Sequence, residues 1–138
     1  MTSARYRIMV ALVARGDERA VIKQAVLYRE KFNAQLIAMH NNQPALSQPK
    51  GAIDSKVTEM DIQGRFIEYG YEHIVEDVEI IIEYGESISK IINKYADDID
   101  LVIIGHRKQT TFKSQIMDSV DEGISNLVSC PVLVVQKN

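Results

Sequence analysis

The stretch DLVIIGHRK, residues 100 to 108, contains the pattern that decides the fold of this chain. An apolar run ends at Gly105 and an amphipathic segment follows, as when a buried strand leads through a turn into a helix. A glycine between a strand and a helix often marks a phosphate-binding turn. This turn holds His106, Arg107 and Lys108 where such turns usually hold more glycine. The stretch therefore predicts an α/β unit and leaves open whether its loop binds a nucleotide.

The same alternation continues outward along the chain. Apolar runs typical of strands buried on both faces occupy residues 6–14, 34–40, 77–83, 100–104 and 131–136. Helical spacing predicts four core-facing stripes, namely Val21, Ala25, Tyr28 and Phe32; Ile53, Val57, Met60, Gly64, Ile67 and Tyr71; Ile88, Ile91, Ile92 and Tyr95; and Ile116, Val120, Ile124 and Leu127. We expect Asp17 to cap the first helix and residues 41–51, which are polar and contain two prolines, to form a long loop. This order predicts a single α/β domain over residues 1–138, with a parallel sheet covered by helices on both faces.

The composition argues against several classes of function. The net charge of −3 gives no basic excess for nucleic acid, and no polybasic run favours a membrane surface. No segment approaches the roughly 20 apolar residues that span a bilayer, and the N-terminal residues do not resemble a signal peptide. The single cysteine, Cys130, excludes an intrachain disulfide and is expected to be buried rather than reactive. We therefore expect a cytoplasmic protein without a nucleic-acid or membrane partner.

Three segments resemble the universal stress protein family. They are IMVALVARGDERA, YGESISKIINKYADDIDLVIIGH and GHRKQTTFKSQIMDSVDEGISNLVSCPVLVV, and together they span the chain except the loop at 41–51. The resemblance implies an open five-stranded parallel sheet in the order 3-2-1-4-5, a Rossmann-like fold of the adenine nucleotide alpha hydrolase-like type. It also implies a homodimer in which the last strand, Val132, Leu133, Val134 and Val135, pairs across a twofold axis. Such pairing would cover an apolar edge strand that is otherwise prone to aggregation.

Nucleotide-binding members of that family carry a glycine, two residues, a second glycine, nine residues, and then a third glycine with Ser or Thr. Here Gly105 matches the first glycine and Ser119 the hydroxyl, but Lys108 and Asp118 replace the other two glycines. Lys108 places a side chain where backbone N–H groups would approach phosphate, although its ammonium can itself meet a phosphate. Asp118 brings negative charge to the expected phosphate position. The family's acid at the end of the first strand is also replaced, by Val13.

The chain thus resembles the branch of the family that lacks the full glycine-rich ATP-binding motif. That branch implies a stress-response binding or regulatory module, not an enzyme, with no resident cofactor and an unknown protein partner. The first alternative is a sensor of ATP or AMP, and the second is a slow nucleotide hydrolase. Candidate cofactor-binding residues are Leu12, Val13, Asn41, Gly105, Arg107, Lys108, Asp118 and Ser119, and the sequence indicates no catalytic residue.

His40 and His106 end the second and fourth strands, which flank the first strand in the order 3-2-1-4-5, so we expect both side chains to overhang one cleft. A metal site requires at least a third ligand, and the sequence contains no motif with ligand spacing. We expect hydrogen-bonded histidines at these two positions rather than metal ligands.

Overall fold

The computed structural model describes residues 5–42, 56–85, 87–107 and 129–137, and it forms a five-stranded parallel sheet in the order β3-β2-β1-β4-β5. The strands are β1 (Arg7–Leu12), β2 (Gln35–Asn42), β3 (Glu79–Tyr84), β4 (Leu101–Arg107) and β5 (Val132–Lys137). The helices are α1 (Arg19–Phe32), α2 (Glu59–Glu68) and α3 (Ile88–Tyr95), with short 3-10 helices η2 (Glu72–Asp77) and η3 (Ala96–Asp98). The predicted fold class and strand order are therefore confirmed.

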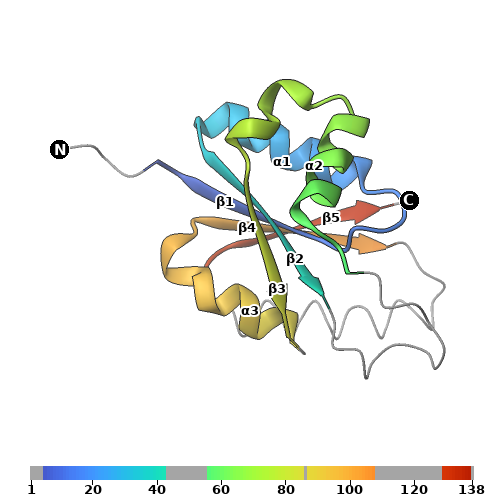
Figure 1. The fold of residues 1–138 in the computed structure, drawn as a ribbon. Coiled ribbons are helices and arrows are strands. Elements are labelled where there is room, and N and C mark those ends of the chain that lie inside the picture. The colour runs from blue at the N-terminus through green and yellow to red at the C-terminus, as the bar shows by residue number, and fades with distance from the viewer. Residues whose placement is uncertain (1–4, 43–55, 86, 108–128, 138) are drawn as a thin grey trace, which may run out of the picture.

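Helices cover both faces of the sheet, with α1 and α2 on one face and α3 on the other (Figure 1). Alternate residues of the inner strands point to opposite faces, as the pleat requires. Val10 and Ile103 pack beneath α1 and α2, whereas Met9 and Val102 pack against α3. Because both faces are covered, the inner strands are apolar along nearly their whole length, which made them recognisable in the sequence.

Several strand ends differ from the prediction. The first strand ends at Leu12 rather than residue 14, because the backbone turns out of the sheet and Ala14 takes a left-handed φ of 60°. The second strand continues to Asn42, so the first two residues of the predicted 41–51 loop belong to the sheet. The fourth strand continues through Gly105 to Arg107, because this segment pairs with β5 up to Lys137.

The predicted core face of the second helix is wrong within α2, although Val57 and Tyr71, which flank the helix, pack against the core as predicted. Ile62 and Phe66 are fully buried in α2, whereas Met60 is 79% exposed and Ile67 is 45% exposed. The helix carries two apolar stripes. The stripe with Ile62 and Phe66 is buried, and the stripe with Met60 and Ile67 is exposed. Helix α2 begins after Thr58, whose side chain forms a capping box with Asp61. Ile53 lies outside the described residues.

The predicted core residues of α3 are confirmed, whereas those of α1 are shifted. In α3 the core residues are Ile91 and Ile92, with Ile88 and Tyr95 packed at their margin, as predicted. In α1 the stripe is shifted, because Ile22 and Val26 join Val21 and Ala25 in the core while Phe32 is half exposed beside Tyr6. The fourth predicted stripe, Ile116, Val120, Ile124 and Leu127, lies outside the described residues.

Candidate functional site

The candidate site lies where the strands end at their carboxyl edge. In an open parallel sheet, ligands bind beyond this edge where the strand order reverses. The order here reverses at β1, whose neighbours are β2 and β4. Residues that follow Leu12, together with the ends of β2 and β4, therefore surround the position where a ligand is expected.

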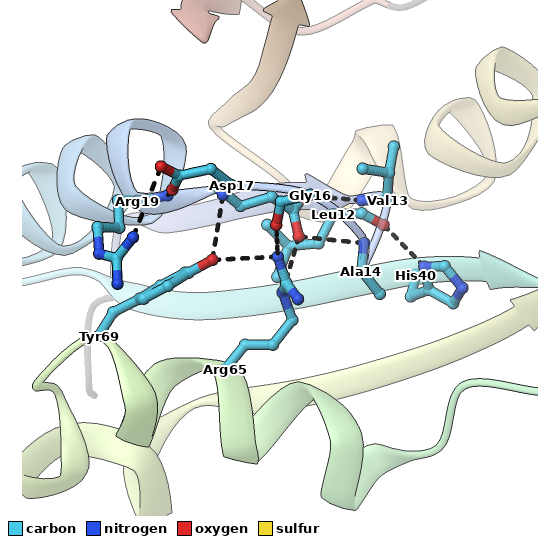
Figure 2. Close-up of polar contacts among 10 residues, drawn as sticks. Leu12, Val13, Ala14, Gly16, Asp17, Arg19, His40, Arg65 and Tyr69 are labelled. Carbon is cyan, nitrogen blue, oxygen red and sulfur yellow. Dashed lines mark hydrogen bonds and ion pairs between the residues drawn. The ribbon is translucent and has the colours of Figure 1, made fainter. Parts of the chain in front are cut away.

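Glu18 fills the turn between β1 and α1. Its carboxylate accepts a hydrogen bond from the backbone N–H of Val13 at 2.9 Å and another from the N–H of Ala14 at 3.1 Å (Figure 2). The residue is 1% exposed and stands at the N-cap of α1. The two backbone donors at the end of β1 thus point at a carboxylate of the protein itself.

Arg65 of α2 completes this cluster from the neighbouring helix. Its Nε lies 2.9 Å from Glu18 Oε1, and its Nη2 donates to the carbonyl oxygen of Gly16 at 2.7 Å (Figure 2). The hydroxyl of Tyr69 accepts from Arg65 and from the backbone N–H of Glu18, each at 3.1 Å. The Arg19 guanidinium lies 4.9 Å from the Tyr69 ring centre. A charge-balanced pair, buried Glu18 and largely buried Arg65, therefore joins the turn to α2.

The prediction that Asp17 caps α1 is wrong. Its Oδ1 accepts the backbone N–H of Arg19, two residues on, and its carboxylate pairs with the Arg19 side chain. This contact closes a local turn one residue before the N-cap position, and its donor is the N–H of Arg19, the first residue of α1. Glu18, the N-cap residue, directs its side chain backward to Val13 and Ala14.

His40 holds the carbonyl group at the end of β1. Its Nδ1 lies 2.8 Å from the carbonyl oxygen of Leu12, the residue opposite it in the sheet (Figure 2). Because a carbonyl oxygen can only accept, Nδ1 carries the proton. The prediction of a hydrogen-bonded histidine is confirmed for His40. Within the described ranges no group of three His, Cys, Asp or Glu side chains is arranged to hold a metal ion.

The side-chain amides of Asn41 and Asn42, at the end of β2, contact different segments of the chain. Asn42 makes a two-point contact with the backbone of Val57, which fixes the approach to α2. Asn41 donates from Nδ2 to the carbonyl oxygen of Gly85 at 3.0 Å. Asn41 is 8% exposed, and its Oδ1 has no hydrogen-bond partner in the described part of the chain. This oxygen is a buried acceptor at the edge where a ligand is expected.

Gly105 lies inside β4 rather than in a turn, which corrects the sequence prediction. Ile104 pairs with Ala11, so Gly105 lies level with the end of β1. A Cβ at position 105 would lie 2.8 Å from Val21 Cγ2 and 2.9 Å from Lys137 Cδ. Close packing of α1 and β5 on the strand therefore requires glycine here, independently of any phosphate.

The structure brings together four of the eight predicted cofactor-binding residues. Leu12, Val13, Asn41 and Gly105 lie at or next to the carboxyl edge. Arg107 ends β4. Three further residues, Lys108, Asp118 and Ser119, lie outside the described residues.

The sequence analysis missed Glu18 and Arg65, the charged pair that organises the turn. An acid that directly follows Asp17 and precedes Arg19 has the pattern of a solvated helix end. Its burial depends on Arg65, which belongs to a different helix and is distant in sequence. No local signal could have identified the pair.

A titratable cluster at the end of β3 and the thiol of Cys130 take no part in the polar contacts at the end of β1. The Tyr95 hydroxyl donates to Glu83, and Lys94 Nζ lies 3.2 Å from Glu83 Oε2, so these contacts lower the pKa of Glu83. The same hydrogen bond raises the pKa of Tyr95. Cys130 is partly buried against the core beneath α3, and burial raises the pKa of its thiol, as expected for an unreactive cysteine.

Comparison with known proteins relates the whole chain to one family. The model described as the Universal stress protein family matches residues 5–136. A universal stress protein in complex with cAMP is similar over 99% of this chain and 100% of its own, with a TM-score of 0.71 and 17% identity. No curated protein matches the chain significantly. In the described residues, no helix is long and apolar enough to cross a membrane.

Two further solved structures have similar folds. The universal stress protein UspA from Lactobacillus plantarum is similar over 97% of this chain and 99% of its own, with a TM-score of 0.63 and 18% identity. A universal stress protein from Archaeoglobus fulgidus in complex with dAMP is similar over 94% and 97%, with a TM-score of 0.63 and 17% identity. These likenesses establish the fold.

Proposed function

Because this chain belongs to the universal stress protein family, we propose that it is a non-catalytic, cytoplasmic binding and regulatory protein of the stress response. The main observation behind this proposal is that the backbone N–H groups of Val13 and Ala14 donate to the carboxylate of Glu18. The partner of such a module is a protein rather than a resident cofactor.

The polar backbone groups at the end of β1 are already used within the protein. A bound phosphate needs exposed N–H donors and a positive local field. Here two such donors point at Glu18, and the Leu12 carbonyl accepts from His40. A polyphosphate that entered this turn would have to displace a buried carboxylate from Arg65. These contacts support a role that does not depend on nucleotide at this turn.

The second candidate function is an adenine-nucleotide sensor, and Asn41 favours it. Its Oδ1 is a buried acceptor without a partner among the described residues, and an exocyclic amino group of adenine could donate to it. Relatives of the same fold are known in complex with cAMP and dAMP. In this candidate, Gly105 and Arg107 would border the phosphates together with Lys108 and Ser119.

Melting curves and a turnover assay separate these functions. A ligand that binds only the folded state raises Tm by mass action. The proposal predicts no rise in Tm with ATP, AMP or cAMP and no turnover of ATP with magnesium. A saturable rise in Tm would favour the sensor, and turnover that falls in Lys108→Ala would favour a slow hydrolase.

A restored variant provides the positive control. Val13→Asp combined with Lys108→Gly and Asp118→Gly recreates the pattern of the nucleotide-binding branch. If the sequence departures explain the absence of binding, this variant gains a saturable rise in Tm with ATP while the wild-type chain shows none. A rise of equal size in both proteins would contradict the proposal.

The homodimer implied by the family resemblance remains part of the proposal. In the described residues, β5 pairs only with β4 and leaves its other edge open. Val134 is 42% exposed on this strand. Pairing of two β5 strands would satisfy the open backbone groups and cover Val134.

A further inference from the structure

Helix α2 carries a second apolar stripe that faces away from the sheet. Met60 is 79% exposed, Ile67 is 45% exposed, and Gly64 lies between them on the same side of the helix. A Cβ added at Gly64 would meet no atom within 4 Å. The stripe, Met60–Gly64–Ile67, therefore has two large side chains around an open notch.

The surroundings of this stripe are acidic. Glu59, Asp61 and Glu68 are exposed at its margins. Arg65 is the one basic residue of α2, and it is turned inward to Glu18 and Gly16. Within the described part of the chain, neither Glu59 nor Glu68 forms an ion pair. The outward face of α2 thus suits an apolar side chain that is flanked by cations.

Helix α1, on the same side of the sheet (Figure 1), presents such a group. Leu27 is 41% exposed, and Lys23 and Lys31 are exposed four residues before and after it. Residues four apart lie on one helix face, so these three side chains form a row. Neither lysine forms an ion pair with the residues that the structure describes.

We propose that the outward face of α2 docks onto the outward face of α1 of a second copy of this chain. Leu27 of one copy enters the notch at Gly64, while Lys23 and Lys31 meet Glu59 and Glu68. The lengths agree, because the nine residues from Glu59 to Glu68 rise about 13 Å and the eight from Lys23 to Lys31 rise about 12 Å. Opposite charges at the margins set the register and disfavour α2 against α2.

This contact differs from pairing through β5. It uses side chains on the helical layer, whereas β5 uses a backbone edge of the sheet. Two such surfaces on one chain would let dimers assemble further. The proposal is also independent of nucleotide, since none of its residues belongs to the carboxyl edge.

Reciprocal charge reversal tests the contact. Lys23→Glu with Lys31→Glu makes the α1 face acidic, and Glu59→Lys with Glu68→Lys makes the α2 face basic. Sedimentation velocity across a concentration series should show that each double variant self-associates at least about tenfold more weakly than wild type. An equimolar mixture of the two variants should regain association, because each acidic α1 face then meets a basic α2 face.

Control variants distinguish this contact from a general charge effect. Glu72→Lys with Glu76→Lys gives the same change in net charge at exposed positions of η2 and should leave association unchanged. Gly64→Gln fills the notch and should weaken association without a loss of folding. Association of the wild type should also weaken with salt.

Three results would overturn the proposal. The first is a wild-type chain with no concentration-dependent association beyond that of the double variants. The second is a mixture that associates no better than its components. The third is equal weakening by the η2 control, which would indicate net charge rather than the paired faces. Because all the substituted side chains are exposed, circular dichroism should show the same folded state in every variant.

Discussion

A single buried carboxylate, that of Glu18, organises the turn after β1. It accepts two backbone N–H bonds, pairs with Arg65, and is nearly inaccessible to solvent. A buried charge is tolerated only when it is paired and hydrogen-bonded, and Glu18 meets both conditions. The residue therefore fixes the turn and links it to α2.

Removal of either member of this ion pair should strongly destabilise the fold. Glu18→Ala leaves the Arg65 guanidinium without its carboxylate partner and two backbone N–H groups without their acceptor, so we expect a loss of about 3 kcal/mol in unfolding free energy. Arg65→Met should also be destabilising, and the double variant should lose less than the sum. Urea unfolding measures all three. Single losses below about 1 kcal/mol would indicate a weak, solvent-screened pair instead.

Acid should weaken the contact between β3 and α3. Contacts with Tyr95 and Lys94 hold the pKa of Glu83 below its ordinary value of 4.5. A lowered folded-state pKa stabilises the protein above the unfolded value, and this contribution is lost as pH falls below 4.5 through the folded value. Urea unfolding at neutral and acid pH should show a smaller acid loss in Tyr95→Phe than in wild type. Equal losses in both proteins would contradict this assignment.

At the scale of the elements, periodicity identified which segments are helices and strands more reliably than which face is buried. The strands beneath both helical layers are apolar over most of their length, so their positions were clear although their ends were not. Helix α2 was ambiguous because it has two apolar stripes, and the sequence pattern favoured the longer one. Phe66 and Ile62 are buried because they face β3 and the core beneath α1 and α2, a tertiary fact that the local pattern does not contain.

Two glycines should respond oppositely to alanine. Gly105→Ala places a methyl group 2.8 Å from Val21, so we expect a loss of about 1–3 kcal/mol from overpacking. Gly64→Ala meets no neighbour and should stabilise α2 by about 0.5–1 kcal/mol. Urea unfolding tests both changes, and adding Val21→Ala should recover part of the Gly105→Ala loss. A neutral Gly105→Ala would mean that packing does not require this glycine.

At the scale of the whole molecule, the alternating elements and the family resemblance predicted the topology fully, but they predicted the candidate site only in part. The sheet order brings Leu12, Val13, Asn41 and Gly105 to one edge, as expected. What occupies that edge depends on side chains from separate elements. Glu18, Arg65 and His40 come together there only in the folded chain. Spacing along the sequence therefore could not reveal that Glu18 and His40 bind the backbone groups at the end of β1.

Association through the last strand is a separate prediction for the whole molecule. If β5 strands pair across a twofold axis, Val134→Lys should weaken the dimer by placing like charges opposite each other. Analytical ultracentrifugation should show a dimer for the wild type and a larger monomer fraction for the variant. A dimer of unchanged strength would exclude Val134 from the interface, and Lys90→Glu on α3 provides a control away from β5.

The most direct measurement for the proposed function is isothermal titration of the nucleotide-free, folded chain with ATP and magnesium. If the carboxyl edge is held by the protein's own side chains, no binding heat appears even at about millimolar ATP, where a Kd of that order corresponds to only about −4 kcal/mol. The restored variant, Val13→Asp with Lys108→Gly and Asp118→Gly, keeps Glu18 on the turn, so it should bind under the same conditions only if the sequence departures, rather than Glu18, prevent binding. A micromolar Kd for the wild-type chain would contradict the proposal and identify Gly105, Arg107 and Lys108 as part of a modified phosphate site.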